Sequence, residues 1–292
     1  MESSISYAQF WSQPLEIYGP LGTRAYVRSS LTYTHTLLGG PYVVHELRFP
    51  SDPQTGDHTS LPPLPSEAAD GLNIFQNASG VWEDIYNDSI ISVSAAPIHH
   101  SVPCLGYVVT ETPIPGKMEP QKYLPDIKRT KAPMSVLSRL QQGESVQLPD
   151  GTLLRGPPRR MGRKIAILGD TCDPSPIASL AMGADLLIHE ATNAHLPGID
   201  PDTKESDTYE SVEERARSRG HSTPQMAGAF AKRVGARKLI LNHFSARYPG
   251  DDDTDEEAKK IMDAIAYLAE REYGDAVTCA RDFMNIDIPL VP

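Results

Sequence analysis

The sequence predicts an α/β fold in which helices pack on a layered sheet. From Lys164 onward, short apolar runs of strand length alternate with helix-like segments, which is the pattern of helices packed on a sheet. The 292 residues, of which 39% are hydrophobic, are enough to bury a core. The net charge of −11 excludes a generally basic nucleic-acid coat. No run approaches the ~20 apolar residues that a membrane span needs.

The second half of the chain contains the clearest elements. A threonine cap and a first-turn proline at Thr223-Pro224 predict a helix, which Gly235 ends. Glu256–Glu272 predicts an amphipathic helix, and the acidic run Asp251–Glu257 complements the dipole at its start. The other elements expected here are strands at Lys164–Leu168, Asp185–Ile188 and Lys238–Leu241, and a helix at Ile177–Met182.

The first half is richer in proline, of which the chain has 26, and it predicts short strands between long loops. Pro50–Gly71 is expected to be a loop, and Thr112–Pro133 an extended arm. Val146–Leu154 is typical of a hairpin that turns at Asp150-Gly151. The other elements expected here are strands at Leu15–Tyr18, Tyr42–Phe49, Ser89–Ser94 and Gly106–Thr110, and a short helix at Pro133–Gln142.

The three cysteines and the N-terminal residues give information about the cellular compartment of the protein. Cys104, Cys172 and Cys279 are far apart and odd in number, which excludes a disulfide scaffold and a Cys-x-x-Cys zinc site. They fit a reducing, intracellular compartment. The start of the chain has no basic segment followed by an apolar one, so no secretory signal is expected. Cytoplasm, nucleus and mitochondrion stay open, although the lack of arginine before Arg24 disfavours a mitochondrial presequence.

Metal-binding residue types follow several of the expected strands. Because functional groups in α/β sheets gather past the carboxyl ends of strands, we expect these side chains to meet. Carboxylates and imidazoles together suit zinc, and two zinc ions about 4 Å apart suit phosphoryl chemistry. A lone histidine after a strand is usually an edge residue, but four such strand ends in order are much less easily accidental. The residues are His100, Asp170, Glu190, His221 and His243.

Several motifs carry a family resemblance: Pro14–Pro20, His100–Tyr107, Gly169–Thr171, His189–Thr192, Gly220–Thr223 and Asn242–Tyr248. The sequence resembles the C-terminal half of the catalytic region of ribonuclease Z, a transfer-RNA 3′-endonuclease family of the metallo-β-lactamase superfamily. The resemblance runs from about Pro14 to about Ile288. It implies an αββα sandwich and hydrolysis of the phosphodiester just after the discriminator nucleotide of a precursor transfer RNA.

The resemblance also implies roles for single residues. His100 would bind a first zinc ion, His243 a second, and Asp170 would bridge the two. His221 would assist proton transfer to the leaving ribose oxygen, and Glu190 would orient a neighbouring imidazole, His221 being the expected one. The residues expected on the substrate side are Ser245, Arg247 and Tyr248.

One departure from the family concerns its main metal motif, His-x-His-x-Asp-His, which lies upstream of the strand matched by Pro14–Pro20. None of the nine histidines belongs to such a motif. We therefore expect a sandwich that is incomplete in its N-terminal half, apolar sheet surface left exposed, weak zinc binding and little nuclease activity. Two alternatives remain: a non-catalytic chain that binds RNA or a partner, and another phosphodiesterase of the same fold.

The positive charge is concentrated in one window. Lys122–Lys164 holds ten basic and three acidic residues, so its charge is 10 − 3 = +7 and the remainder carries −18. We expect residues 1–292 to form a single domain with 112–164 as an inserted basic arm that contacts phosphates of precursor transfer RNA. The alternative is a solvated pair of loops, and a homodimer stays open. The arm residues expected to bind substrate are Arg155, Arg159 and Arg160.

Overall fold

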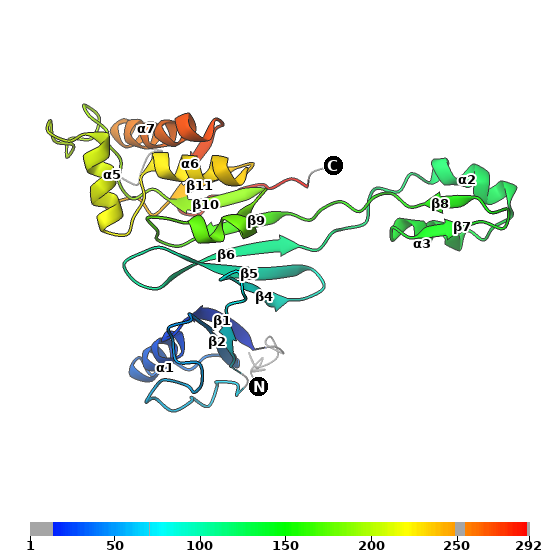
Figure 1. The fold of residues 1–292 in the computed structure, drawn as a ribbon, viewed down its shortest axis with the longest axis horizontal. Coiled ribbons are helices and arrows are strands. Elements are labelled where there is room, and N and C mark those ends of the chain that lie inside the picture. The colour runs from blue at the N-terminus through cyan, green and yellow to red at the C-terminus, as the bar shows by residue number, and fades with distance from the viewer. Residues whose placement is uncertain (1–13, 70, 249–254, 291–292) are drawn as a thin grey trace, which may run out of the picture.

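A seven-stranded mixed sheet lies at the centre of the molecule (Figure 1), in a computed structural model that describes residues 14–69, 71–248 and 255–290. The strand order is β12-β11-β10-β9-β6-β5-β4. Neighbours from β9 to β12 are parallel, and those from β4 through β9 are antiparallel. The strands are β4 (Trp82–Asn87), β5 (Ile91–Ile98), β6 (Cys104–Glu111), β9 (Lys164–Leu168), β10 (Leu186–Glu190), β11 (Leu239–Asn242) and β12 (Val277–Cys279).

Helices cover one face of this sheet (Figure 1) and bury the main core. The predicted helix after Thr223 is confirmed: the threonine side chain accepts from the Met226 N–H, and Gly235 ends the helix in the left-handed region at φ 61°. At Gly228 a Cβ atom would lie 2.3 Å from a backbone oxygen of the last helix, so this close packing requires glycine. The helices are α4 (Ala178–Ala181), α5 (Tyr209–Ser218), α6 (Pro224–Val234) and α7 (Glu256–Tyr273).

The acidic start expected for α7 is described only in part. Residues 251–254 of that run lie outside the described residues. Asp255 is the N-cap, and its carboxylate accepts from the Glu257 N–H at 2.8 Å. Acidic side chains at Glu256 and Glu257 occupy the first turn, where they complement the helix dipole.

A second, three-stranded parallel sheet lies below the strands β4 to β6 (Figure 1). It consists of β1 (Leu15–Pro20), β2 (Tyr42–Arg48) and β3 (Asn73–Phe75), with α1 (Thr23–Tyr33) beside it. Leu47 packs against Trp82 and Leu105 between the two sheets. The second layer is therefore short. Ile167 alternates with helix-facing neighbours on β9 and is 40% exposed, so the described residues leave this part of the opposite sheet face accessible.

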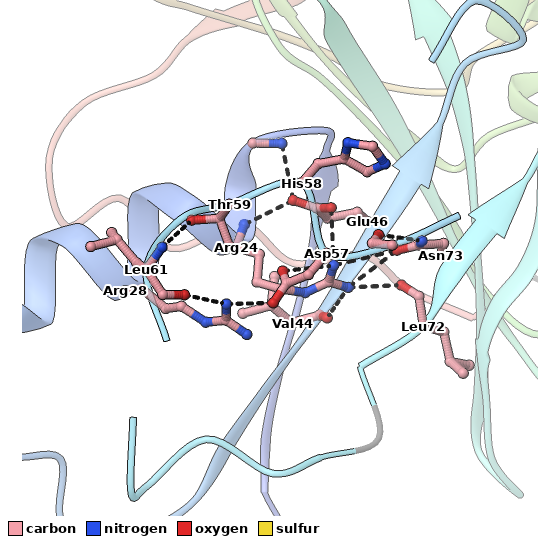
Figure 2. Close-up of polar contacts among 12 residues, drawn as sticks. Arg24, Arg28, Val44, Glu46, Asp57, His58, Thr59, Leu61, Leu72 and Asn73 are labelled. Atoms are coloured by element: carbon pink, nitrogen blue, oxygen red, sulfur yellow. Dashed lines mark hydrogen bonds and ion pairs between the residues drawn. The ribbon is translucent and has the colours of Figure 1, made fainter. Parts of the chain in front are cut away.

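A buried cluster of charged residues, here called the arginine cluster, ties α1 and the loop 50–72 to β2. Figure 2 shows Arg24 beside Glu46, with Asp57 and Asn73 around the same guanidinium group. The Glu46 carboxylate also accepts from the N–H groups of Gly22 and Arg24 at the start of α1, which has no side-chain cap of its own. The members of the arginine cluster are Arg24, Arg28, Glu46, Arg48 and Glu67.

The segment between β6 and β9 extends away from the sheet (Figure 1). It contains α2 (Pro120–Arg129), α3 (Ser135–Gln141) and the hairpin β7 (Ser145–Gln147) and β8 (Leu153–Arg155), around a small core of its own. The predicted short helix and hairpin are confirmed. The prediction of an extended chain over Thr112–Pro133 is wrong at α2, where Ile127 faces that core despite the nearby prolines and lysines.

Among the described residues, no helix is long and apolar enough to cross a membrane.

Candidate metal centre

Ionisable side chains from separate strand ends meet at one edge of the seven-stranded sheet. Asp170 follows β9, Glu190 ends β10, His243 follows β11, His100 precedes β6, and His221 precedes α6. Because β9, β10 and β11 are parallel, their carboxyl ends lie together. Ligand atoms of His100, Asp170 and His221 all lie within 4.8 Å of one another, as do those of Glu190, His221 and His243. His243 Nε2 lies 3.4 Å from Asp170 Oδ2.

Glu190 is the buried hub of this arrangement, with 1% of its surface exposed. Its carboxylate accepts from the Thr171 N–H at 2.6 Å, the Ser222 N–H at 3.1 Å and the Thr192 hydroxyl at 2.5 Å. Its Oε1 also lies 3.0 Å from His221 Nδ1. The protein thus uses all the acceptor capacity of Glu190, which holds the surrounding loops together rather than offering a free oxygen to a ligand.

The neighbouring imidazoles are held through one nitrogen each. His100 Nδ1 lies 2.8 Å from the Gly220 carbonyl oxygen and must donate to it. His243 Nδ1 lies 2.8 Å from the Thr192 hydroxyl, and since that hydroxyl donates to Glu190, the histidine donates in turn. This leaves Nε2 of each ring as the atom that can bind a metal, and His243 Nε2 lies 3.4 Å from Asp170 Oδ2. A neutral imidazole that donates through Nδ1 to a backbone carbonyl or a polar side chain is the usual form of a metal ligand.

Two backbone positions in the centre are unusual. Gly220 has φ +84°, and a Cβ atom there would lie 2.4 Å from His100 Nδ1. Glycine is therefore required both by its conformation and by the approach of the imidazole. His243 has φ 53°, a left-handed conformation that is costly for a residue with a side chain and that clusters at functional sites.

The donor set fits zinc in type. Two imidazole nitrogens and a carboxylate are typical zinc ligands, and the side chains of Asp170 and His243 are 37% and 45% exposed, which leaves access for a substrate. If Asp170 bridges two ions, the residues assigned from the sequence supply only two donors to each, His100 with Asp170 and Asp170 with His243. Open catalytic zinc sites keep three protein ligands.

The residues expected on the substrate side pack on the loop after β10. Tyr248 is buried, and its hydroxyl accepts from the Ala194 N–H at 2.8 Å. Arg247 Nη2 donates to the Tyr248 hydroxyl at 2.6 Å and lies 3.4 Å from Asp200 Oδ2, while its side chain stays 29% exposed. Ser245 is half-buried. In this conformation Arg247 is the best exposed of the three.

The arm arginines lie away from the metal centre. The arm leaves the sheet at the amino end of β9, whereas Asp170 follows its carboxyl end (Figure 1). Arg155 is exposed, and Arg159 donates through Nε to the Pro113 carbonyl at 3.0 Å. Arg160 Nε is buried without a hydrogen-bond partner. The structure therefore does not bring these arginines together with the proposed ligands.

Sequence reasoning assigned no role to Thr192 or Gly220. Both lie in motifs that carry the family resemblance, but neither residue was predicted to hold a histidine. The available signal was a hydroxyl two residues after Glu190 and a glycine directly before His221. Neither signal identifies its partner, because the histidines that these two residues hold are far away in the chain.

Comparisons with known proteins identify the family. The chain is 36% identical to zinc phosphodiesterase ELAC protein 1 of Bos taurus over 303 aligned residues, which cover 95% of the chain and 75% of the relative. It is 30% identical to ribonuclease Z of Limosilactobacillus reuteri over 283 residues, or 95% and 72% of the two chains. No protein-family model matches the chain.

A solved structure agrees with these relatives. The crystal structure of the short form of human tRNase Z, ELAC1, superimposes with a TM-score of 0.53 and 27% identity, over 96% of this chain and 69% of that one. The chain therefore belongs to the ribonuclease Z family and has its metallo-β-lactamase fold.

Proposed function

We propose that the chain is a zinc-dependent endoribonuclease that removes the 3′ trailer of precursor transfer RNA by hydrolysing one phosphodiester bond. One observation carries the proposal: His100 and His243 are each held through Nδ1, which leaves Nε2 for a metal, and both histidines have a ligand atom near the Asp170 carboxylate. Membership of a family whose members are named ribonuclease Z and tRNase Z supports the RNA substrate.

In this proposal each residue of the centre has a distinct task. His100, Asp170 and His243 would hold zinc, which supplies a hydroxide nucleophile and stabilises charge on the phosphoryl oxygens when bound. Glu190 fixes His221 with its proton on Nδ1 and so leaves Nε2 free to pass a proton to the leaving ribose oxygen. Thr192 carries the same constraint from Glu190 to His243.

Zinc affinity tests the ligand count. Since the assigned residues supply two donors per ion, we propose that residues 1–292 by themselves bind zinc weakly and cleave slowly. Calorimetric titration of the 292-residue chain with zinc should show weak binding that His243→Ala removes. Two tight sites in the wild-type chain would contradict this proposal.

The cleavage product tests the activity. At saturating zinc, the chain should cut a precursor transfer RNA at the start of the trailer, and slow cleavage at that position is sufficient support. A small phosphodiester such as bis(p-nitrophenyl) phosphate is the comparison substrate. Cleavage of only the small substrate would indicate a different phosphodiesterase, and RNA binding without any cleavage would indicate a non-catalytic RNA-binding chain.

We propose further that residues 1–292 form one domain and that its inserted arm, 112–164, contacts transfer RNA. Arg155 pairs with β7 through its backbone, and its exposed side chain has no hydrogen bond or ion pair among the described residues, so its charge is available to a phosphate. The variant Arg155→Glu/Arg159→Glu should weaken transfer-RNA binding strongly. Lys259→Glu/Lys260→Glu on α7, which changes the net charge equally, is the matched control. Equal affinity in both variants would count against the arm.

A further inference from the structure

A small pocket of about 280 Å³ is lined in part by residues that lie close in the chain to those of the metal centre, and it contains none of the proposed ligands. Three of the segments that line it also carry a residue of the centre. Asn193 follows Thr192 directly, Arg247 lies four residues after His243, and Arg219 lies two residues before His221 in the chain. The remaining wall comes from the loop 200–207 and from α5.

The charges that line the pocket are mostly positive. The cations are Lys204, Arg215, Arg219 and Arg247, and the acids are Asp202 and Asp207. Four positive and two negative charges leave an excess of two positive charges in a small space. In a chain whose net charge is −11, such an excess is a local feature and favours an anion.

Two of the four cations are committed to holding the loop. Arg215 Nη1 lies 2.9 Å from Asp207 Oδ1, and the Arg215 hydrogen bond is the main cause that lowers the pKa of Asp207. Arg247 Nη2 lies 3.4 Å from Asp200 Oδ2, and Asp200 is itself buried and accepts from the Asp202 N–H at 2.9 Å. These two pairs set the shape of the rim.

The other two cations are uncommitted. The side chains of Lys204 and Arg219 are exposed and take part in no hydrogen bond or ion pair given by the described part of the chain. Lys204 contributes to the lowered pKa of Asp207, but less than Arg215 does. An exposed lysine and arginine that converge on one pocket from different segments supply the donors that a single phosphate group needs.

We propose that this pocket binds one backbone phosphate of the RNA strand beside the cleaved bond, with Lys204 and Arg219 as its main contacts. The inference rests on the proposed function, because the metal centre next to the pocket must hold an RNA strand. It assigns Lys204 and Arg219 to substrate positioning and leaves the chemistry to the metal centre.

The test measures binding of a precursor transfer RNA with a 3′ trailer to the 292-residue chain as a function of salt. Lys204→Ala/Arg219→Ala should weaken binding about tenfold or more at low salt. The slope of log affinity against log salt should fall by about 0.7, as expected for the loss of one phosphate contact on a single strand. The matched control Lys259→Ala/Lys260→Ala, also exposed, should bind like wild type.

A second experiment identifies which phosphate of the RNA the pocket binds. Uncharged methylphosphonate linkages are placed one at a time along the trailer and the 3′ end of the transfer RNA. A methylphosphonate at one position should weaken binding to the wild-type chain. It should not weaken binding to the double variant any further, because that variant has already lost its contact with this phosphate. The single variant Lys204→Ala should show part of this effect, and it leaves the residue next to Gly220 intact.

Each other outcome is decisive. If the double variant binds RNA like wild type, the inference is overturned and the proposed function stands. The inference is also overturned if the double variant loses only affinity for inorganic phosphate, since the pocket would then serve a free anion. If the wild-type chain at saturating zinc does not cut the precursor transfer RNA at the start of the trailer, the proposed function fails, and the assignment of the pocket to the strand beside the cleaved bond fails with it.

Discussion

The arginine cluster and the metal centre are both groups of charged side chains. They differ in how deeply the side chains are buried and in how many of their polar atoms are hydrogen-bonded within the protein. Arg24, Arg28, Glu46 and Arg48 are at most 5% exposed, and Glu46 accepts four hydrogen bonds from backbone and side-chain donors. In the metal centre, Asp170 and His243 are substantially exposed. There, ligand atoms of His100, Asp170 and His221 lie within 4.8 Å of one another, and His243 Nε2 lies 3.4 Å from Asp170 Oδ2.

The difference separates a structural cluster from a functional one. Burying charged groups is tolerated when they find partners, and each guanidinium group of the arginine cluster is paired with a carboxylate, although Arg48 Nε itself has no hydrogen-bond partner. Arg28, for example, has Glu67 on one side and Asp57 on the other, and the hydrogen bond to Glu67 raises its pKa. The metal centre keeps the Asp170 carboxylate and the His243 imidazole at an open edge, where a metal ion or a substrate can reach them.

Loss of a ligand should have the largest effect in the metal centre. We expect Asp170→Ala to abolish both zinc binding and cleavage while unfolding in urea changes little, because the side chain is partly exposed and holds no loop in place. His221→Ala should slow cleavage by about 10²–10⁴-fold with zinc retained. Calorimetry and single-turnover cleavage measure the two effects. Equal zinc loss in both variants would show that His221 is a ligand.

Loss of a partner should have the opposite signature in the arginine cluster. Glu46→Ala removes the buried carboxylate that two buried guanidinium groups and the start of α1 share, and it should lower the free energy of unfolding by about 3–5 kcal/mol. Asp57→Asn is the control, because Asp57 is 41% exposed and should cost at most about 1 kcal/mol. Urea unfolding at constant pH measures both. A similar cost for the two variants would mean that burial does not set the energetics of this cluster.

Glu190 combines both kinds of role. Glu190→Gln keeps the shape of the side chain but places an N–H₂ group where oxygen accepted, so either Oε1 or Oε2 loses its donors. We expect zinc affinity to fall by about 10–100-fold and stability to fall by about 1–3 kcal/mol. Glu83→Gln, at an exposed site on β4, is the control and should change neither. An effect on stability alone would make Glu190 a purely structural residue.

We expect the smallest effect from lowering the pH, which should reduce the stability of the fold. Burial lowers the pKa of His45 in the N-terminal layer and of His189 in the main core. Below pH ~6.5 the unfolded chain therefore binds more protons at these positions than the folded one, so stability should fall as pH drops from 7.5 to 5.5.

His45→Gln tests this sign. The glutamine oxygen can still accept the hydrogen bond that the Leu72 N–H donates to His45 Nδ1 at 3.2 Å. The variant should lose less stability than wild type over the same pH range, as measured by the urea midpoint. An unchanged pH dependence would rule out His45 as a contributor.

The sequence predicted well those elements whose signal is local. The strands β9, β10 and β11 are apolar runs, and α6 carries its own cap and stop, so their positions are confirmed. Helix α1 escaped prediction because its buried face consists of Arg24 and Arg28, which read as solvent-exposed until their partners are known. Helix α5 escaped because only Val212 and Ala216 are buried in a segment that is otherwise charged.

The sequence by itself determined which residue types stand at the strand ends, and their motifs were sufficient to indicate the ribonuclease Z family. Residue type is a local property, so it can be read without the fold. Only the tertiary structure decided that Glu190 reaches His243 through Thr192, and that Lys204 and Arg219 line one pocket. Hydrogen-bond partners and burial depend on residues distant in the chain, and they decide whether a charge is committed to the protein or is available to a substrate.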